Sequence, residues 1–172
     1  MPLLPVHYRA SFPKTSAQKN IVGEIEMKDV VIVDSVRTGL AKSYRGSFNM
    51  TRSDDMAAHC IDALLARNPG LDPGAVEDVV LGCGLPEGVQ GMNLGRNSAM
   101  LSNLPVEVPG MVLNRYCSSG LQSIAIAATQ IGSGCSDVVM AGGVENITLT
   151  QTKMNTDGVM NNKLFQEFPG LY

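Results

Sequence analysis

The sequence predicts an α/β protein whose elements follow in the order βαβαβαβ around a mostly parallel sheet. Short runs of apolar, β-branched residues alternate with longer amphipathic stretches, and those stretches end at Gly, Pro or Asn. The chain has 172 residues, of which 44% are hydrophobic, so it can bury a sizeable core. Ligands of such sheets bind beyond the carboxyl ends of the strands, where we therefore expect the functional residues.

The first strand is expected over residues 29–36 (DVVIVDSV), a β-branched run typical of a central parallel strand that is buried on both faces. A helix is expected to begin at Ser53, whose hydroxyl can cap free N–H groups, and the two acids that follow suit the positive end of the helix dipole. Its apolar stripe ends before residues 68–70 (NPG). The second strand is expected over residues 76–83 (VEDVVLGC).

After a loop, a second helix is expected over residues 93–104 and a third strand over residues 111–114. The third helix is expected over residues 118–131 and the fourth strand over residues 137–141. This third helix is apolar on almost every side, so we expect it to be the most buried helix. One sheet covers one side of a helix, and a second layer must come from elsewhere in the polypeptide or from a partner.

Charge and composition argue against several classes of function. The formal net charge of -3 comes without a basic stripe, and no apolar run approaches about 20 residues, so we expect neither nucleic-acid binding nor membrane insertion. Four cysteines and two histidines lie far apart without a C-x-x-C pair, so we expect no metal site. So few cysteines, without a secretory signal, favour a cytoplasmic protein with free thiols.

The N-terminal stretch differs from the rest of the chain. Residues 1–27 contain three prolines and no acid before Glu24, so we expect a loose extension. An over-long start ahead of Met27 and a transit peptide, which would place the protein in an organelle, are alternative explanations. Residues 28–150 are expected to form the structured domain, and residues 151–172, rich in Asn and Thr, to open a further loop region.

Cys117 lies within NRYCSSGL (residues 114–121), at the turn between the third strand and the third helix. A helix N-terminus favours a thiolate over a thiol and can hold an oxyanion that forms on an attacked carbonyl. We therefore expect Cys117 to be a catalytic nucleophile. The alternative is a small buried residue, which is the role that we expect for Cys60 and Cys135. The residues expected to support the nucleophile in its turn are Asn114, Ser118, Ser119 and Gly120.

Three segments closely resemble thiolases: KDVVIVDSVRT (residues 28–38), NRYCSSGLQSIAIAATQI (114–131) and DVVMAGGVENIT (137–148). They occur in the order found in that family. Between them, EGVQGMNLGRNSAM (87–100) resembles the thiolase loop and second helix, so the resemblance covers roughly residues 28–172. Condensing ketoacyl synthases also carry a cysteine before Ser-Ser, but they lack the VVIVDSVRT opening at this distance.

The resemblance implies a thiolase-like fold, with this chain as the incomplete N-terminal half of a layered αβαβα arrangement. It implies acyl transfer between coenzyme A thioesters by Claisen condensation or its reverse, through an acyl-cysteine at Cys117. Coenzyme A, acetyl-CoA and other acyl-CoA molecules would be substrates, with no cofactor or metal, and the intact protein would be a homodimer or homotetramer. Residues 28–150 would be the thiolase N-terminal domain, and residues 151–172 the truncated start of a loop domain.

The sequence departs from the family pattern at two short motifs. Residues 37–39 are Arg-Thr-Gly where Arg-Thr-Pro is usual, and residues 145–147 are Glu-Asn-Ile where Glu-Ser-Met is common. Both changes resemble tolerated variation. For Glu145 we expect the capping of backbone N–H groups in the turn after residues 142–143, in preference to a role as general acid.

The family's Asn-Glu-Ala-Phe, Gly-His-Pro and Cys-x-Gly motifs do not occur in the 172 residues. In thiolases they supply the histidine that activates the nucleophile and a second cysteine that moves the proton. His59, in the first helix, and His7, in the extension, are not positioned to replace that base. We therefore expect the first part of a thiolase, inactive by itself. The alternative is a non-catalytic thiolase-like dimerisation or acyl-CoA-binding module.

Overall fold

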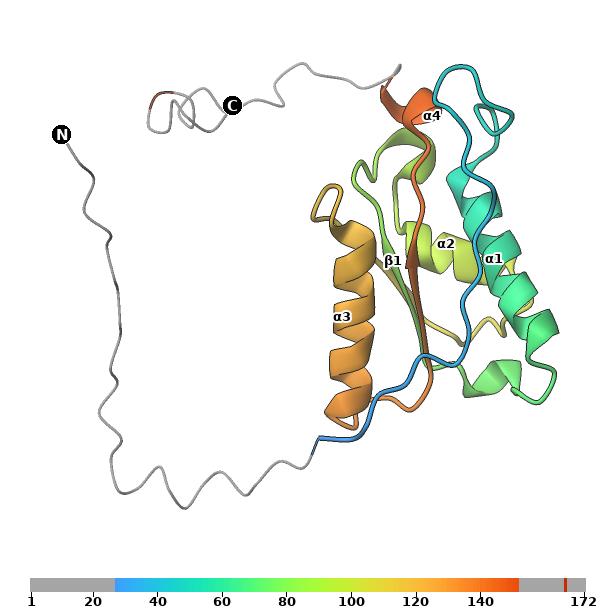
Figure 1. The fold of residues 1–172 in the computed structure, drawn as a ribbon, viewed down its shortest axis with the longest axis vertical. Helices are drawn as coiled ribbons and strands as arrows, with labels where there is room; N and C mark the ends of the chain where they lie inside the picture. The colour runs from blue at the N-terminus through green and yellow to red at the C-terminus, as the bar shows by residue number, and fades with distance from the viewer. Residues whose placement is uncertain (1–26, 152–165, 167–172) are drawn as a thin grey trace.

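The computed structural model of the protein describes residues 27–151 and residue 166. The expected extension over residues 1–27 and loop region over residues 151–172 therefore lie almost entirely outside the described residues. The elements, shown in Figure 1, are α1 (Ser53–Arg67), η2 (Pro73–Ala75), β1 (Asp78–Gly82), η3 (Gly88–Gln90), α2 (Leu94–Leu101), β2 (Gly110–Leu113), α3 (Ser119–Gly132), β3 (Val139–Gly143) and α4 (Ile147–Gln151).

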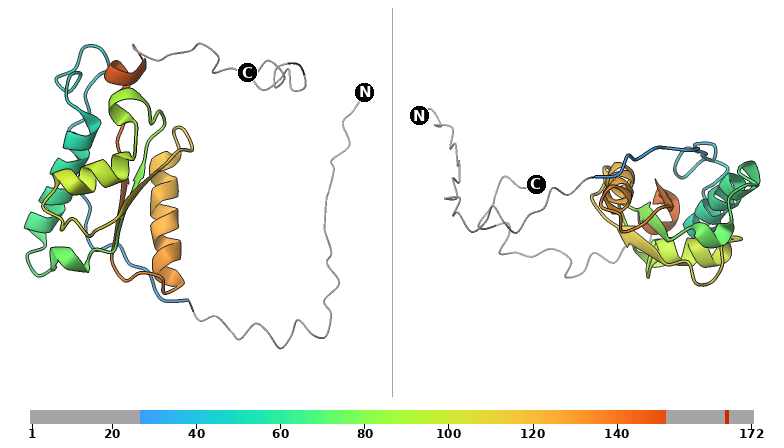
Figure 2. Two further views of the ribbon diagram at one scale, coloured as in Figure 1. Left: turned by 180° about the vertical axis from the view of Figure 1, so that it is seen from behind. Right: turned by 90° about the horizontal axis from the view of Figure 1, so that it is seen from below.

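Three parallel strands form the sheet of the described residues, in the order β2-β1-β3. Helices α1 and α2 lie on one face and α3 lies on the other, as Figures 1 and 2 show from three directions. Side chains alternate between the faces of a strand, so Val79 and Leu81 point to the α1 side and Gly82 to α3. The main buried cluster lies on the α1 side and consists of Ala57, Ile61, Val76, Val79, Leu81, Ala99, Leu104 and Val108.

The prediction of a central strand over residues 29–36 is wrong, because this described segment forms no strand. β1 is central and pairs with β2 and β3 on its two edges, and the segment pairs with neither of the outer edges that β2 and β3 leave free. The segment instead lies along the outside as the blue trace of Figure 1, with Ile32 79% exposed. Polar contacts hold it: the Lys28 N–H donates to the Gly132 carbonyl over 2.9 Å, and Asp34 pairs with Arg67 over 2.7 Å. A β-branched run indicates extended backbone, but it does not determine which strand accepts it.

The helix expected from Ser53 is confirmed as α1, but the expected capping of that helix by the Ser53 hydroxyl is wrong. Ser53 is the first helical residue, and its buried hydroxyl donates to Oε1 of Gln90 over 2.6 Å instead of capping the helix. Arg52 precedes the helix and pairs with Asp54 over 2.7 Å. The acids of the first turn are present as expected, and the helix ends at Arg67, before Asn68.

Helix α3 is not the most buried helix of the described chain. Its buried positions are small residues: Ser119 and Ser123 face the sheet, Ala127 is also buried, and Gly132 lies against residues 27–30. Leu121 is 74% exposed on the side opposite the sheet. Among residues 27–151 no second layer covers that opposite side. The remaining expected strands and helices agree with β1, α2, β2 and β3 to within a few residues. In the described part of the chain, no helix combines the length and the apolar character that crossing a bilayer requires.

Candidate active site

Cys117 occupies a tight turn between β2 and α3 and is exposed to solvent. Tyr116, directly before it, has a φ of 50°. This left-handed conformation is unfavourable for a non-glycine residue and needs other contacts to hold it. The Ser118 N–H donates to the Arg115 carbonyl over 3.1 Å and closes the turn. The alternative in which Cys117 is a small buried residue is therefore wrong.

Two of the four expected supporting residues hold this turn by hydrogen bonds. The buried Ser119 hydroxyl accepts from the Arg115 N–H over 2.8 Å and donates to the Tyr116 carbonyl over 2.6 Å. Oδ1 of Asn114 accepts from the Tyr116 N–H over 2.7 Å. These three bonds fix the backbone on the N-terminal side of Cys117. Ser118 is the exposed N-cap residue of α3.

Glycines bring the first turn of α3 into contact with the ends of β1 and β3. A Cβ atom on Gly82 would lie 2.3 Å from the Ser119 carbonyl carbon, and one on Gly143 would lie 3.3 Å from Cα of Gly120. Any side chain at Gly82 would push the helix, and Cys117 with it, away from the sheet. The close approach of these two elements therefore requires the glycine.

Cys117 lines a hollow of about 910 Å³ at the carboxyl ends of the strands. Its other walls come from Gly84 and Leu85 after β1, from Val144 and Glu145 after β3, and from α4. The loops after the strands, where we expect the functional residues, thus line this hollow. Cys117 is the only one of the chain's four cysteines, all of which are described, that lines the hollow.

Glu145 joins the two loops that form these walls. Its Oε2 accepts from the Gly84 N–H over 2.6 Å, and its Oε1 accepts from Nε2 of Gln90 over 2.6 Å. The expected capping of a backbone N–H group thus occurs, but in the loop after β1 and not in Glu145's own turn. The sequence contained no signal for this contact, because the partners lie 61 residues apart.

Cys83 is buried beneath this carboxylate, with its Sγ 3.8 Å from Oε1 of Glu145. Burial, as the main cause, and the negative charge of Glu145, as the second, raise the pKa of the Cys83 thiol to about 12. The thiol therefore keeps its proton at neutral pH and donates a hydrogen bond to the carboxylate. A nucleophile needs the thiolate, so Cys83 is not a second nucleophile.

The sequence model described as "Thiolase, N-terminal domain" matches residues 30–168. The chain belongs to the thiolase family. It is 45% identical over 122 residues to a 3-ketoacyl-CoA thiolase of Bacillus subtilis (strain 168), covering 71% of this chain and 31% of that protein. It is 41% identical over 121 residues to a 3-ketoacyl-CoA thiolase of Aeromonas salmonicida (strain A449), covering 70% of this chain and 31% of the relative.

A solved structure agrees with this assignment. The crystal structure of the Bacillus anthracis acetyl-CoA acetyltransferase superimposes with a TM-score of 0.67 at 31% identity, covering 77% of this chain and 34% of that chain. The α/β thiolase-like fold expected from the sequence is therefore confirmed. This thiolase-family chain spans about a third of the length of the relatives that it matches.

Gln90 of this thiolase-family chain was missed by the sequence analysis, and Asn146 was interpreted only as tolerated variation within residues 145–147. The Gln90 side chain is fully buried, and its Oε1 accepts from Ser53 and from the Asn146 N–H. Nδ2 of Asn146 donates to the carbonyls of Phe48, Asn49 and Thr51 over 3.1, 3.2 and 2.8 Å. A Gln in a Gly-rich loop and an Asn after a strand carry no periodic signal, so only the fold identifies them.

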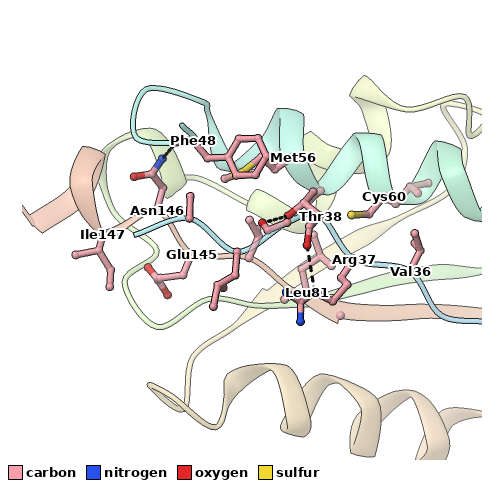
Figure 3. A pocket seen from close by; sticks show the side chains of 18 of the residues that line it. Val36, Arg37, Thr38, Phe48, Met56, Cys60, Leu81, Glu145, Asn146 and Ile147 are labelled. Atoms are coloured by element: carbon pink, nitrogen blue, oxygen red, sulfur yellow. Dashed lines mark hydrogen bonds between the residues drawn. The ribbon is translucent and has the colours of Figure 1, made fainter. Parts of the chain in front are cut away.

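A second hollow of about 430 Å³ lies between α1, the sheet and the loop that contains Arg37 and Thr38 (Figure 3). It shares Glu145 with the first hollow but does not include Cys117. Cys60 lines it and is half-buried, in fair agreement with the expected packing role.

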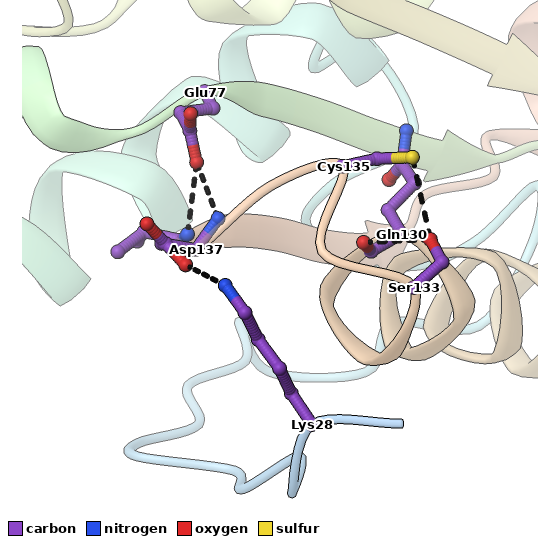
Figure 4. Close-up of polar contacts among 7 residues, drawn as sticks. Lys28, Glu77, Gln130, Ser133, Cys135 and Asp137 are labelled. Carbon is purple, nitrogen blue, oxygen red and sulfur yellow. Dashed lines mark hydrogen bonds and ion pairs between the residues drawn. The ribbon is translucent and has the colours of Figure 1, made fainter. Parts of the chain in front are cut away.

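Cys135 is exposed at the opposite end of the sheet, so its expected burial is wrong. Figure 4 shows it beside Ser133, whose Oγ lies 3.3 Å from its Sγ, and near the Lys28–Asp137 ion pair of 2.7 Å. The described residues contain no group of three or more His, Cys, Asp or Glu side chains that could hold a metal ion. His59 is exposed on α1 and lines neither hollow, while His7 lies outside the described residues.

Proposed function

We propose that the intact protein is a thiolase of the acetyl-CoA C-acyltransferase type, which transfers acyl groups between coenzyme A thioesters. Cys117 is the acylated nucleophile in this proposal. The observation that carries it is the place of Cys117 at the N-terminus of α3, exposed in the hollow at the carboxyl ends of the strands. The names of the relatives, 3-ketoacyl-CoA thiolase and acetyl-CoA acetyltransferase, support the same chemistry.

In the cleavage direction, the Cys117 thiolate attacks the 3-oxo carbonyl of a 3-oxoacyl-CoA. The tetrahedral adduct then collapses: the carbon–carbon bond breaks, and its electron pair leaves as the acetyl-CoA enolate, which takes up a proton. The sulfur of free coenzyme A next attacks the acyl-cysteine and releases the Cys117 thiolate with the new acyl-CoA. The N-terminus of α3 supplies partial positive charge toward the oxyanion of each adduct.

Asn114, Ser118, Ser119 and Gly120 have the supporting role in this proposal. Two of them fix the turn by hydrogen bonds, Ser118 is the N-cap residue of α3, and Gly120 lies in the first turn of that helix, where Gly143 of β3 approaches it. Since Gly-His-Pro and Cys-x-Gly do not occur in the 172 residues, we expect the general base from outside them. Residues 28–150 act as the thiolase N-terminal domain in this proposal, and residues 151–172 open its loop domain.

The proposal includes acetyl-CoA and other acyl-CoA molecules as substrates, with no further cofactor. It places the protein in the cytoplasm, where its four free cysteines stay reduced. A homodimer or homotetramer is proposed for the intact protein. Exposed apolar side chains on α3, such as Leu121 at 74%, support such an association.

Mass spectrometry tests the proposal. We expect peptides of the intact protein, incubated with acetyl-CoA, to carry an acetyl group on Cys117 and those of its Cys117→Ser variant to carry none. Acetylation that maps to Cys60, Cys83 or Cys135, or that persists in Cys117→Ser, would contradict the assignment of the nucleophile. Acetyl-CoA that binds without acylating any cysteine would favour the non-catalytic acyl-CoA-binding module.

A further inference from the structure

We infer that Glu145 is a positioning residue for Cys117: its carboxylate fixes the wall of the hollow that faces the nucleophile. The inference rests on the proposed function of Cys117 and adds a residue that does not itself touch the thiol. Glu145 is hydrogen-bonded to Gly84, which lines the same hollow as Cys117.

Gly84 lies between the carboxylate and the turn of the nucleophile. Its N–H donates to Oε2 of Glu145 over 2.6 Å. A Cβ on Gly84 would lie 2.9 Å from that same oxygen and 3.5 Å from the carbonyl carbon and oxygen of Tyr116, the residue before Cys117. Gly84 therefore lies against the carboxylate and beside the turn, and a displaced carboxylate would move the wall of the hollow next to Cys117.

Gln90 anchors the carboxylate from the other side. Its fully buried amide donates to Oε1 of Glu145 over 2.6 Å and to the Leu85 carbonyl over 2.8 Å. Leu85 and Gly84 both line the hollow, so the anchored loop forms part of its wall. Loss of the Glu145 acceptor would leave a buried N–H group without that partner, which favours displacement of the loop.

The arrangement is that of a fixed acceptor and not of a proton donor. Each carboxylate oxygen accepts a hydrogen bond from an N–H group, and the Cys83 thiol lies at 3.8 Å from both oxygens. Hydrogen bonds to an ionised carboxylate are shorter and stronger than neutral ones, so one side chain can hold two loops. Glu145 thus acts on the nucleophile by geometry.

The test compares two reactions of Cys117 in the intact protein. Acylation by acetyl-CoA needs the hollow in its correct shape, whereas alkylation by iodoacetamide, a small reagent, needs only an accessible thiol. We expect Glu145→Gln to lower the rate of acylation about 10- to 100-fold, as a misplacement of about 1 Å can do. The alkylation rate is expected to stay within about threefold of the unchanged chain, since the exposed thiol remains accessible.

Glu87→Gln is the matched control, because Glu87 is an exposed glutamate of the same loop and loses the same charge. We expect it to leave both rates unchanged. Equal acylation rates in Glu145→Gln and the unchanged chain would overturn the inference, and so would equal losses in both reactions, which indicate a general structural role. An unchanged intact protein that is alkylated but never acylated at Cys117 would overturn the proposed function itself.

Gly84→Ala decides the matter if Glu145→Gln does not fold. The added methyl group would lie 2.9 Å from Oε2 and displace the carboxylate without removing its charge. We expect at least a tenfold loss of acylation with alkylation preserved. Unchanged acylation in this variant would overturn the inference.

Discussion

Burial and the neighbouring carboxylate of Glu145 both raise the pKa of the Cys83 thiol. This raised pKa makes the stability of the folded chain depend on pH. An unfolded thiol has a pKa of about 8.5, whereas the folded one has a pKa of about 12. Above the lower value the unfolded chain releases a proton that the folded chain retains. The contribution of Cys83 is therefore complete below about pH 8 and is lost as the pH rises toward 12.

We expect the free energy of unfolding to fall by up to about 1.4 kcal/mol per pH unit over this range. Urea unfolding at pH 7.5, 9.5 and 10.5 measures it, with Cys83→Ala as the reference that removes the thiol but retains every other titrating group. As the pH rises, the free energy of unfolding of the unchanged chain should fall relative to that of Cys83→Ala. Parallel pH profiles would refute the buried-thiol explanation.

Two glycines near the nucleophile have opposite steric surroundings. A Cβ on Gly82 would meet the Ser119 backbone at 2.3 Å, whereas one on Gly120 would meet nothing within 4 Å. We therefore expect Gly82→Ala to destabilise the chain by about 1–3 kcal/mol through overpacking. We expect Gly120→Ala to be neutral or to stabilise it by up to about 1 kcal/mol, because alanine favours a helix. Thermal unfolding of both variants checks the pair, and a similar loss in the two would contradict the close approach at Gly82.

Among the elements, the connection after β3 ties the loop before α1 to the sheet through a single side chain. The Asn146 amide donates to three carbonyls between Phe48 and Thr51. A serine, common here in the family, has one O–H group and satisfies at most one of them. We therefore expect Asn146→Ser to lower the free energy of unfolding by about 1–3 kcal/mol and to loosen the loop before α1.

Limited trypsin digestion measures this loosening, because Lys42 and Arg45 lie in the loop before α1. We expect cleavage at these two sites to accelerate in Asn146→Ser, while cleavage at Arg67, at the end of α1, changes little. Faster cleavage at all three sites would instead indicate global unfolding.

The elements also show how far local sequence patterns reach. The β1, β2 and β3 strands and the α1–α3 helices follow from periodicity and from Gly, Pro and Asn at their ends, because those signals are local. The run over residues 29–36 had an equally strong local signal, but it pairs with neither of the outer edges that β2 and β3 leave free. Pairing is a property of the whole sheet, so a local pattern could not exclude that strand.

The same limit applies to the site. Cys117 was predictable because its strand, turn and helix are contiguous, and Ser119 and Asn114 lie within a few residues of it. Glu145, Gln90 and Asn146 contact groups 37 to 98 residues away. A contact at such a distance depends on topology and leaves no mark in the spacing of nearby residues.

For the whole molecule, we expect slow turnover by the 172-residue chain. The described residues place no histidine at the Cys117 hollow, and general-base assistance is typically worth about 10²- to 10⁴-fold. Thiolysis of acetoacetyl-CoA should therefore be slower by about this factor than in a full-length relative measured alongside. Comparable turnover would show that the chain contains a base in another position.

The parallel sheet has a consequence for how the chain reaches this structure. β1 bonds to β2 and β3, which follow it by about 30 and about 60 residues, so no pair of strands can form as a hairpin. Closing such long loops before any pairing is gained makes folding slow. During synthesis on the ribosome, β1 must therefore wait, with one edge unpaired, until the residues of β3 have emerged.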